Sequence, residues 1–324
     1  MLIGYRFKSM MKLLTMPERA RGFPLIMRGD SHRLATSLAR GQKSEVRGPN
    51  LEGGGQISPV ASQGSVIKQL KEAAKRLAIT VVYNRFAAFL YVGQANREYF
   101  RIHGVPDSKL FFSPHAVDNE RFMAEPDKTH AAGVAWRAEL GIPKDYLVVM
   151  FAGKFEAKKR PLALLAAFQH LDRKDVSLLF VGSGALEPQL REKAGSASNV
   201  FFAPFQNQSQ MPRTYAACDL FVLPSFGPNE TWGLAINEAL CLKKPVIVSD
   251  HVGCAADLVH TRINGWVFPA GRLDALTSTV EEALADRCRL QKFGEAGFEI
   301  VKEYNYARAS AGLEAALEAL SARK

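Results

Sequence analysis

The stretch "DLFVLPSFGPNETWGLAINEALCLKKPVIVSD", residues 219–250, holds two short apolar runs on either side of a helical segment. The runs "DLFVLPS" and "PVIVSD" predict strands, and "WGLAINEALCL" between them predicts a helix. Both runs are continuously apolar rather than alternating, which is typical of strands buried on both faces of a parallel sheet. The stretch therefore indicates one strand–helix–strand unit of an open α/β sheet.

The same alternation continues over residues 147–270. The apolar runs predict further strands at 147–153, 176–184 and 199–204, with helices at 161–171, 185–194 and 211–218. Ligands of such sheets bind at the carboxyl ends of the strands, so the loops at those ends are the places to look for function.

The front half of the chain is less regular. Strands are expected at 23–29, 87–94 and 109–118, with an amphipathic helix at 66–79. Residues 41–65 are poor in apolar side chains and rich in Gly, Ser and Pro, and predict a mobile loop. The tail, 289–323, reads as helices.

The bulk composition bounds the class of protein. A chain of 324 residues with 47% hydrophobic content can bury a large core, and its length favours two domains. No apolar stretch is long enough to span a membrane, and the first residues do not predict a signal peptide. Cys218, Cys241, Cys254 and Cys288 lack metal-ligand spacing, so we expect idle thiols in a reducing compartment and no bound metal.

The formal charge of +10 is unevenly distributed. Residues 1–50 carry ten Lys and Arg against three acids. Such a basic segment is typical of a solvated face, and it also suits contact with an anionic membrane surface or a phosphate-bearing substrate. No zinc-finger, RNA-binding or helix-turn-helix pattern is present, so nucleic acid is not expected as a partner.

Two carboxylates lie around the start of the helix predicted in the opening stretch. Glu230 precedes the tight turn at Gly233, and Glu238 follows it inside the helix. A helix N-terminus offers backbone N–H groups to an anion, and carboxylates accept hydrogen bonds from vicinal hydroxyls. A sugar joined to a nucleoside by a diphosphate matches this order of groups. Taken alone, the pair is better explained as a helix cap and a surface acid.

A second loop adds positive charge. "GKFEAKKRP", residues 153–161, places Lys154 and Lys159 directly after a predicted strand. Two cations there suit a diphosphate and the charge that grows on it as it leaves. "VGSGALEPQL", residues 181–190, adds a glycine turn that runs into a helix but lacks the full dinucleotide-binding pattern.

Together these segments resemble the retaining GT-B glycosyltransferases of family 4. The resemblance runs from "PHAVDNERF", residues 114–122, to the end of the chain. It includes "FAGKFEAKKRPLALLAAF", "LLFVGSGALEPQL", "YAACDLFVLPS", "ETWGLAINEALCLKKPVIVSD", "VGCAADLV" and "NGWVFPAG". It implies two Rossmann-like lobes and a sugar-nucleotide donor, with no cofactor and no metal.

The resemblance also implies roles for individual residues. Lys154, Lys159 and Glu230 would be catalytic, with Glu230 on the hydroxyls of the transferred sugar. Glu238 would bind the ribose diol. The remaining donor-binding positions would be Gly153, Gly182, Gly184, Phe205, Thr231, Trp232, Gly233 and Leu234. The family usually has Arg where Lys154 stands and Gly where Arg160 stands.

The front lobe departs from the family pattern. Only about 22 residues precede "FPLIMRGDSH", so the N-terminal lobe is expected to be truncated. Asp30 and His32 are the nearest candidates for the acceptor side. The expected organisation is an incomplete acceptor lobe at 1–118, a linker at 119–146, a donor lobe at 147–305, and a helix at 306–324 that packs back on the first lobe.

The resemblance leaves alternatives open. The expected reaction is transfer to a glycan, lipid-linked or small-molecule acceptor, as in surface polysaccharide biosynthesis, in the cytoplasm or at the inner membrane face. A donor-binding remnant without activity and a nucleotide-sugar epimerase on the same fold are the alternatives. A phosphorylase would need a lysine setting for pyridoxal phosphate that the sequence lacks.

Overall fold

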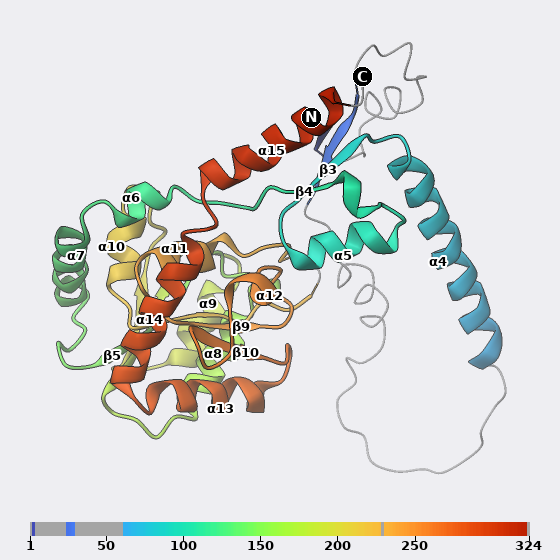
Figure 1. Ribbon diagram of the computed structural model, residues 1–324. Helices are drawn as coiled ribbons and strands as arrows, with labels where there is room; N and C mark the ends of the chain where they lie inside the picture. The colour runs from blue at the N-terminus through green and yellow to red at the C-terminus, as the bar shows by residue number, and fades with distance from the viewer. Residues whose placement is uncertain (1, 4–23, 30–60, 228–229, 323–324) are drawn as a thin grey trace. The chain divides into compact units, whose positions relative to one another are not determined.

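A computed structural model describes residues 2–3, 24–29, 61–227 and 230–322, which belong to two compact units (Figure 1). The described residues of unit 1 fall within 1–92, 96–113 and 312–324, and those of unit 2 fall within 93–95 and 114–311. Each unit is built on a parallel β-sheet, which confirms the predicted α/β class.

Unit 2 contains six parallel strands in the order β10-β9-β8-β5-β6-β7. All six residues of β5 and of β6 are buried, as are all four of β8 and of β9, so helices cover both faces. The strands span Leu147–Ala152 (β5), Val176–Val181 (β6), Val200–Ala203 (β7), Leu220–Leu223 (β8), Val246–Ser249 (β9) and Gly265–Phe268 (β10).

The helices of unit 2 pack in two groups. Helix α8 (Pro161–Gln169) contacts α9 (Glu187–Ala194) and α13 (Leu273–Leu284). On the other side, α11 (Leu234–Cys241) contacts α10 (Met211–Ala216) and α14 (Arg287–Val301), and Figure 1 shows α14 lying alongside α11. Helix α10 also packs on α7 (Pro126–Glu139). The remaining helices are α6 (Asn119–Met123) and α12 (Ala255–Leu258).

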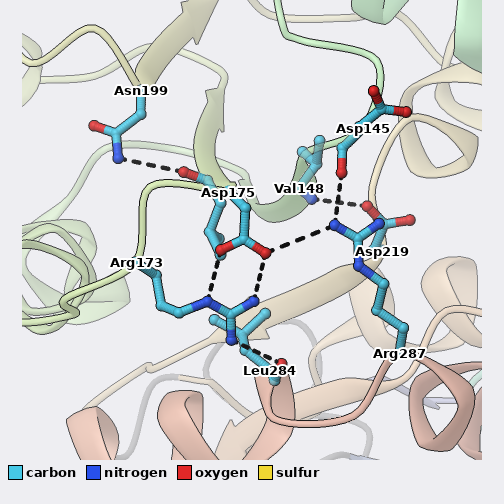
Figure 2. A network of polar contacts seen from close by, with 9 residues as sticks. Asp145, Val148, Arg173, Asp175, Asn199, Asp219, Leu284 and Arg287 are labelled. Atoms are coloured by element: carbon cyan, nitrogen blue, oxygen red, sulfur yellow. Dashed lines mark hydrogen bonds and ion pairs between the residues drawn. The ribbon is translucent and has the colours of Figure 1, made fainter.

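The amino ends of these strands are held by a polar network (Figure 2). Arg173 donates from Nε and Nη2 to the two oxygens of Asp175, each at 2.7 Å, and this guanidinium lowers the pKa of Asp175 to about 2. Arg287 donates to the carbonyl of Asp145 at 2.6 Å. Asp145 precedes β5, Arg173 and Asp175 precede β6, and Arg287 begins α14. The network therefore holds the amino edge of the sheet, and the opposite, carboxyl edge is where ligands of such sheets bind.

Unit 1 contains four parallel strands in chain order, β1 (Leu2–Ile3), β2 (Ile26–Arg28), β3 (Ala88–Tyr91) and β4 (Leu110–Phe112). One face packs on α4 (Ala61–Tyr83) and α5 (Gln94–Ile102) through Met27, Phe89 and Phe100. The other face packs on the end of α15 (Tyr306–Ser321), where Ala316 contacts Ile26 and Leu90. Gly312 of α15 lies so close that a Cβ there would sit 1.9 Å from the carbonyl oxygen of Phe112.

Several predicted boundaries change. Residues 61–65, expected in the mobile loop 41–65, are the first turn of α4, and residues 41–60 lie outside the described part of the chain. The expected linker at 119–146 contains the helices α6 and α7. Helix α7 was missed because its apolar face is weak and interrupted by Gly133. That glycine is required by packing, since a Cβ there would lie 2.7 Å from the backbone of Ala216.

Candidate functional site

The order of strands in unit 2 reverses between β5 and β8. From β5 the chain moves outward through β6 and β7, then returns to β8 and moves the other way. The loops that leave β5 and β8 therefore diverge and leave a crevice between them, which is where open α/β sheets bind ligands. Residues 153–160 form the first loop, and the described residues 224–227 and 230–233 belong to the second.

A pocket of about 380 Å³ lies at this edge of the sheet. Five residues expected at the donor site line it, namely Gly153, Lys154, Lys159, Phe205 and Glu238. Phe205 is 73% exposed, which is unusual for a large apolar side chain and leaves its ring free to stack.

Glu230 joins this group through an ion pair. Lys159 Nζ lies 2.5 Å from Glu230 Oε2, and the two side chains are only 18% and 12% exposed. Ser225 donates from its hydroxyl to the same Glu230 oxygen at 3.0 Å. The structure thus brings together the lysine from the β5 loop and the acid from the β8 loop, which stand 71 positions apart in the sequence.

The two loops are joined at a second point. The backbone N–H of Phe226 donates to the carbonyl of Lys158 at 2.7 Å, and the guanidinium of Arg160 lies 5.5 Å from the centre of the Phe226 ring. Arg160 adopts a left-handed backbone with φ of 55°. That conformation costs a residue with a Cβ about 1–2 kcal/mol, which explains the preference for Gly at this position implied by the resemblance.

The turn before α11 is shaped by two glycines. Gly233 has φ of 99°, and a Cβ there would also press on Val252 at 2.8 Å. The backbone oxygens of Glu230 and Trp232 accept hydrogen bonds from the N–H groups of Gly253 and Cys254, at 3.0 and 2.9 Å.

The side chain of Trp232 faces inward rather than toward a ligand. It is buried, and its Nε1 donates to Asn237 at 2.8 Å. Any contribution of Trp232 to anion binding would therefore come from its backbone N–H, as would that of Gly233 and Leu234, whose side chains carry no donor.

Gly182 and Gly184 lie behind the β5 loop. A Cβ on Gly182 would come within 2.1 Å of the carbonyl oxygen of Gly153, and one on Gly184 within 2.7 Å of the backbone of Phe155. The backbone N–H of Phe155 also donates to Ser183 at 2.9 Å. These glycines let the loop that carries Lys154 pack closely against the β6 turn.

Glu238 is set deeper than the other charged groups. Its residue is 9% exposed, and its Oε2 accepts a hydrogen bond from the Tyr215 hydroxyl at 2.8 Å. Burial raises the pKa of the Glu238 carboxyl above its ordinary value, while the hydrogen bonds from Tyr215 and Gln208 oppose that rise. Tyr215 and Gln208, which precede Glu238 by 23 and 30 positions, were not among the predicted site residues. Tyr215 lies in "YAACDLFVLPS", but that segment alone gives no sign of a contact with Glu238.

Asp257 in α12 is another buried acid that the sequence analysis did not single out. Its two oxygens accept hydrogen bonds from the backbone N–H of Gln94 at 2.9 and 3.1 Å. Burial raises the pKa of this carboxyl to about 6. It does not line the pocket described above, so we assign it to the packing of unit 2.

The histidines contribute little to this pocket. Asp30 and His32, the candidates for the acceptor side, lie outside the described residues. His251 accepts a hydrogen bond at Nδ1 from the N–H of Gly227 at 3.1 Å and so supports the β8 loop. The ring of His115 lies 5.6 Å from that of Trp232.

The described residues contain neither a metal-binding cluster nor a membrane-spanning helix. In that part of the chain, no group of three or more His, Cys, Asp or Glu side chains is placed to hold a metal ion. Over the same residues, no helix combines the length and apolar character needed to cross a membrane.

Comparison with known proteins identifies relatives of this arrangement. The family model described as "Glycosyl transferases group 1" matches residues 134–300. A D-inositol 3-phosphate glycosyltransferase of Segniliparus rotundus is 31% identical over 194 residues, covering 57% of this chain and 42% of that protein. One of Nocardia farcinica is 28% identical over 238 residues, covering 70% of this chain and 50% of that protein. The chain thus spans about half or less of these curated relatives.

Solved structures share the fold at low identity. Anabaena HepE in complex with UDP superposes with a TM-score of 0.68 and 18% identity, over 93% of this chain and 73% of that one. Sucrose-phosphate synthase from Thermosynechococcus elongatus superposes with a TM-score of 0.65 and 20% identity, over 93% and 69% of the two chains. These likenesses confirm the GT-B fold expected from the sequence.

Proposed function

Because the chain belongs to the glycosyl transferases group 1 family, we propose that it transfers a sugar from a nucleotide-diphosphate-sugar donor, with retention at the anomeric carbon. The acceptor would be a glycan, a lipid-linked molecule or a small molecule. The observation that carries this proposal is the grouping of Lys154, Lys159 and Glu238 around one pocket, with Glu230 paired to Lys159.

The diphosphate would lie between the β5 loop and the start of α11. Lys154 and Lys159 supply two cations on one side. On the other, the first N–H groups of α11 have no partners within the helix, and the helix dipole adds partial positive charge. Charge that develops on a leaving diphosphate would be stabilised from both sides.

The sugar would lie next to Glu230. This carboxylate is held by Lys159 and Ser225, and it would accept hydrogen bonds from sugar hydroxyls near the anomeric carbon. Lys159 would then contact both this acid and the leaving phosphate. Lys159 and Glu230 would then lie on either side of the bond that breaks, where they can stabilise the charges that separate as the phosphate leaves the sugar.

In the proposed step, the bond between the anomeric carbon and the phosphate oxygen breaks, and its electron pair leaves with the phosphate. The acceptor oxygen forms its bond to the anomeric carbon on the same face. Its proton passes to the departing phosphate oxygen, which acts as the base. The charges balance without a further co-reactant.

The test is an assay of purified protein with UDP-, GDP- and ADP-sugars, following both hydrolysis and transfer. Glu238→Ala should weaken nucleotide binding, and Lys159→Ala should lower kcat more than it changes affinity. Lys174→Ala and Glu192→Ala, exposed residues that do not line the pocket, are matched controls. Nucleotide binding without turnover would instead support a donor-binding protein, and inversion at C2 without transfer would support an epimerase.

We propose the front segment as the acceptor side, with Asp30 and His32 as its candidate residues. The basic surplus of residues 1–50 supports contact with an anionic membrane surface, as an acceptor attached to a lipid would require. Such contact would place the protein at the inner face of the membrane. Co-sedimentation with phosphatidylglycerol vesicles but not with phosphatidylcholine vesicles is the expected result, and equal sedimentation with both would contradict it.

A further inference from the structure

The hydroxyl of Tyr215 is held in a fixed position against Glu238. The tyrosine ring is 1% exposed and packs edge-on against Phe221 and Phe122, with ring centres 5.3 and 6.3 Å apart. Its hydroxyl donates to Glu238 Oε2 at 2.8 Å. Because the ring has no room to move, the hydroxyl fixes one oxygen of the carboxylate.

Gln208 approaches Glu238 from the pocket lining, and Arg121 determines its orientation. Arg121 Nη2 donates to Gln208 Oε1 at 2.8 Å, and Gln208 lines the same pocket as Glu238. A guanidinium only donates and a carboxylate only accepts. With its oxygen on Arg121, the amide has only its nitrogen to offer to Glu238, and Gln208 favours the charged form of that carboxylate.

We propose that Tyr215 and Gln208 are positioning residues, which together aim the Glu238 carboxylate at the ribose diol of the donor, with Arg121 fixing the Gln208 amide. This inference rests on the proposed function, since it assumes a nucleotide in the pocket. Two donors on the carboxylate leave its remaining lone pairs for the two hydroxyls of a ribose. Arg121 lies on α6, Gln208 in the loop after β7, and Tyr215 on α10. Apart from Phe205, these three elements carry no other proposed site residue.

The same contacts set the pH range in which Glu238 is ionised. Arg121, Tyr215 and Gln208 favour the charged carboxylate, and burial opposes it. The buried thiol of Cys241 also faces this acid. Lys154, Lys158, Lys159 and Glu156 of the β5 loop line the same pocket. Removing the Tyr215 hydroxyl takes away a hydrogen bond to a charged group, so the pKa of Glu238 should rise.

The experiment compares Tyr215→Phe with the unaltered protein. UDP, GDP and ADP affinities are measured by calorimetry from pH 5 to pH 9. A hydrogen bond to a charged group changes an equilibrium constant about tenfold or more. Its loss should therefore raise, by about one pH unit, the midpoint of the fall in nucleotide affinity on acidification. Gln208→Leu should raise it less, because Gln208 is exposed. Tyr146→Phe, which lies before β5 and outside the pocket, is the matched control.

A second measurement does not depend on the nucleotide. Carbon-13 NMR of glutamate-labelled protein follows the Glu238 carboxyl, assigned by its loss in Glu238→Gln. Its pKa should rise in Tyr215→Phe and stay unchanged in Tyr146→Phe. If nucleotides bind and neither the binding midpoint nor this pKa moves, the positioning role is overturned and the proposed function stands. If no nucleotide binds the unaltered protein, the proposed function itself fails and the diol assignment fails with it.

Discussion

Replacement of Gly253 by Ala should separate two segments that the structure holds in direct contact. The N–H of Gly253 donates to the carbonyl of Glu230 at 3.0 Å, which places the glycine beside the turn that leads into α11. A Cβ on Gly253 would lie 1.9 Å from the carbonyl oxygen of Thr231. The backbone of Gly253 is not left-handed, so any effect of Gly253→Ala would come from this contact rather than from backbone strain.

The size of the effect follows from the overlap. Real Cβ atoms essentially never approach a heavy atom closer than 3.0 Å, so the gap must widen by at least the difference, 1.1 Å. Overpacking of this kind costs about 1–3 kcal/mol, which corresponds to a fall in Tm of about 2–12 °C for a unit of this size. A shift of about 1 Å in groups that position a substrate costs about 100-fold in turnover. We therefore expect a clear fall in Tm and a loss of activity of about two orders of magnitude.

The assay is differential scanning fluorimetry together with turnover of whichever nucleotide-sugar the unaltered protein uses. Gly141→Ala is the matched control, because Gly141 is left-handed with φ of 75° but has no heavy atom within 4 Å of the added Cβ. The free energy of unfolding of Gly141→Ala should fall by about 1 kcal/mol through backbone strain, and its turnover should be unchanged. If Gly253→Ala melts within about 1 °C of the unaltered protein and turns over at its rate, the two segments do not constrain each other as argued.

Three further outcomes are expected. Arg160→Gly should be more stable to urea than Arg160→Ala by about 1 kcal/mol, because only glycine relieves the left-handed backbone and both lose the contact with Phe226; equal stability would contradict this. Burial raises the pKa of Asp257 from 3.8 to about 6, so the unfolded chain binds fewer protons between these values, and stability falls as pH rises. From pH 4.5 to pH 7 this group should remove about 2 kcal/mol from the free energy of unfolding of unit 2, seen in urea melts and absent in Asp257→Asn. Iodoacetamide should label Cys288 alone in the native protein, read by mass spectrometry, because the other three thiols are buried and their pKa values are raised.

The sheet of unit 2 could be predicted because its strands are continuous apolar runs with no competing helical period. Residues 147–152, 176–181 and 246–249 are strands in the structure at the places where the sequence predicts them. The position of the pocket also follows, since Lys154 and Glu230 stand in loops after strands and the carboxyl ends of parallel strands meet at one edge.

Other features depend on contacts between distant segments and leave no local signal. The hydrogen bond from Tyr215 to Glu238 joins two helices, and nothing in the sequence around Tyr215 distinguishes it from a core tyrosine. The left-handed backbone at Arg160 runs against the preference of the residue itself, so no local pattern predicts it. Helix α6 is only five residues long, and its buried Phe122 packs against Tyr215, a contact between segments far apart in the sequence.

The loops that leave β5 and β8 are joined by three contacts, namely Lys158 with Phe226, Lys159 with Glu230, and Arg160 with Phe226. Residues 158–160 and 225–230 should consequently vary together among related chains, with a change in one segment matched by a change in the other. Anyone who redesigns donor selectivity by grafting one of these loops from another enzyme would need to transplant both, because a single graft would remove one partner of the Lys159–Glu230 ion pair and of the Arg160–Phe226 contact.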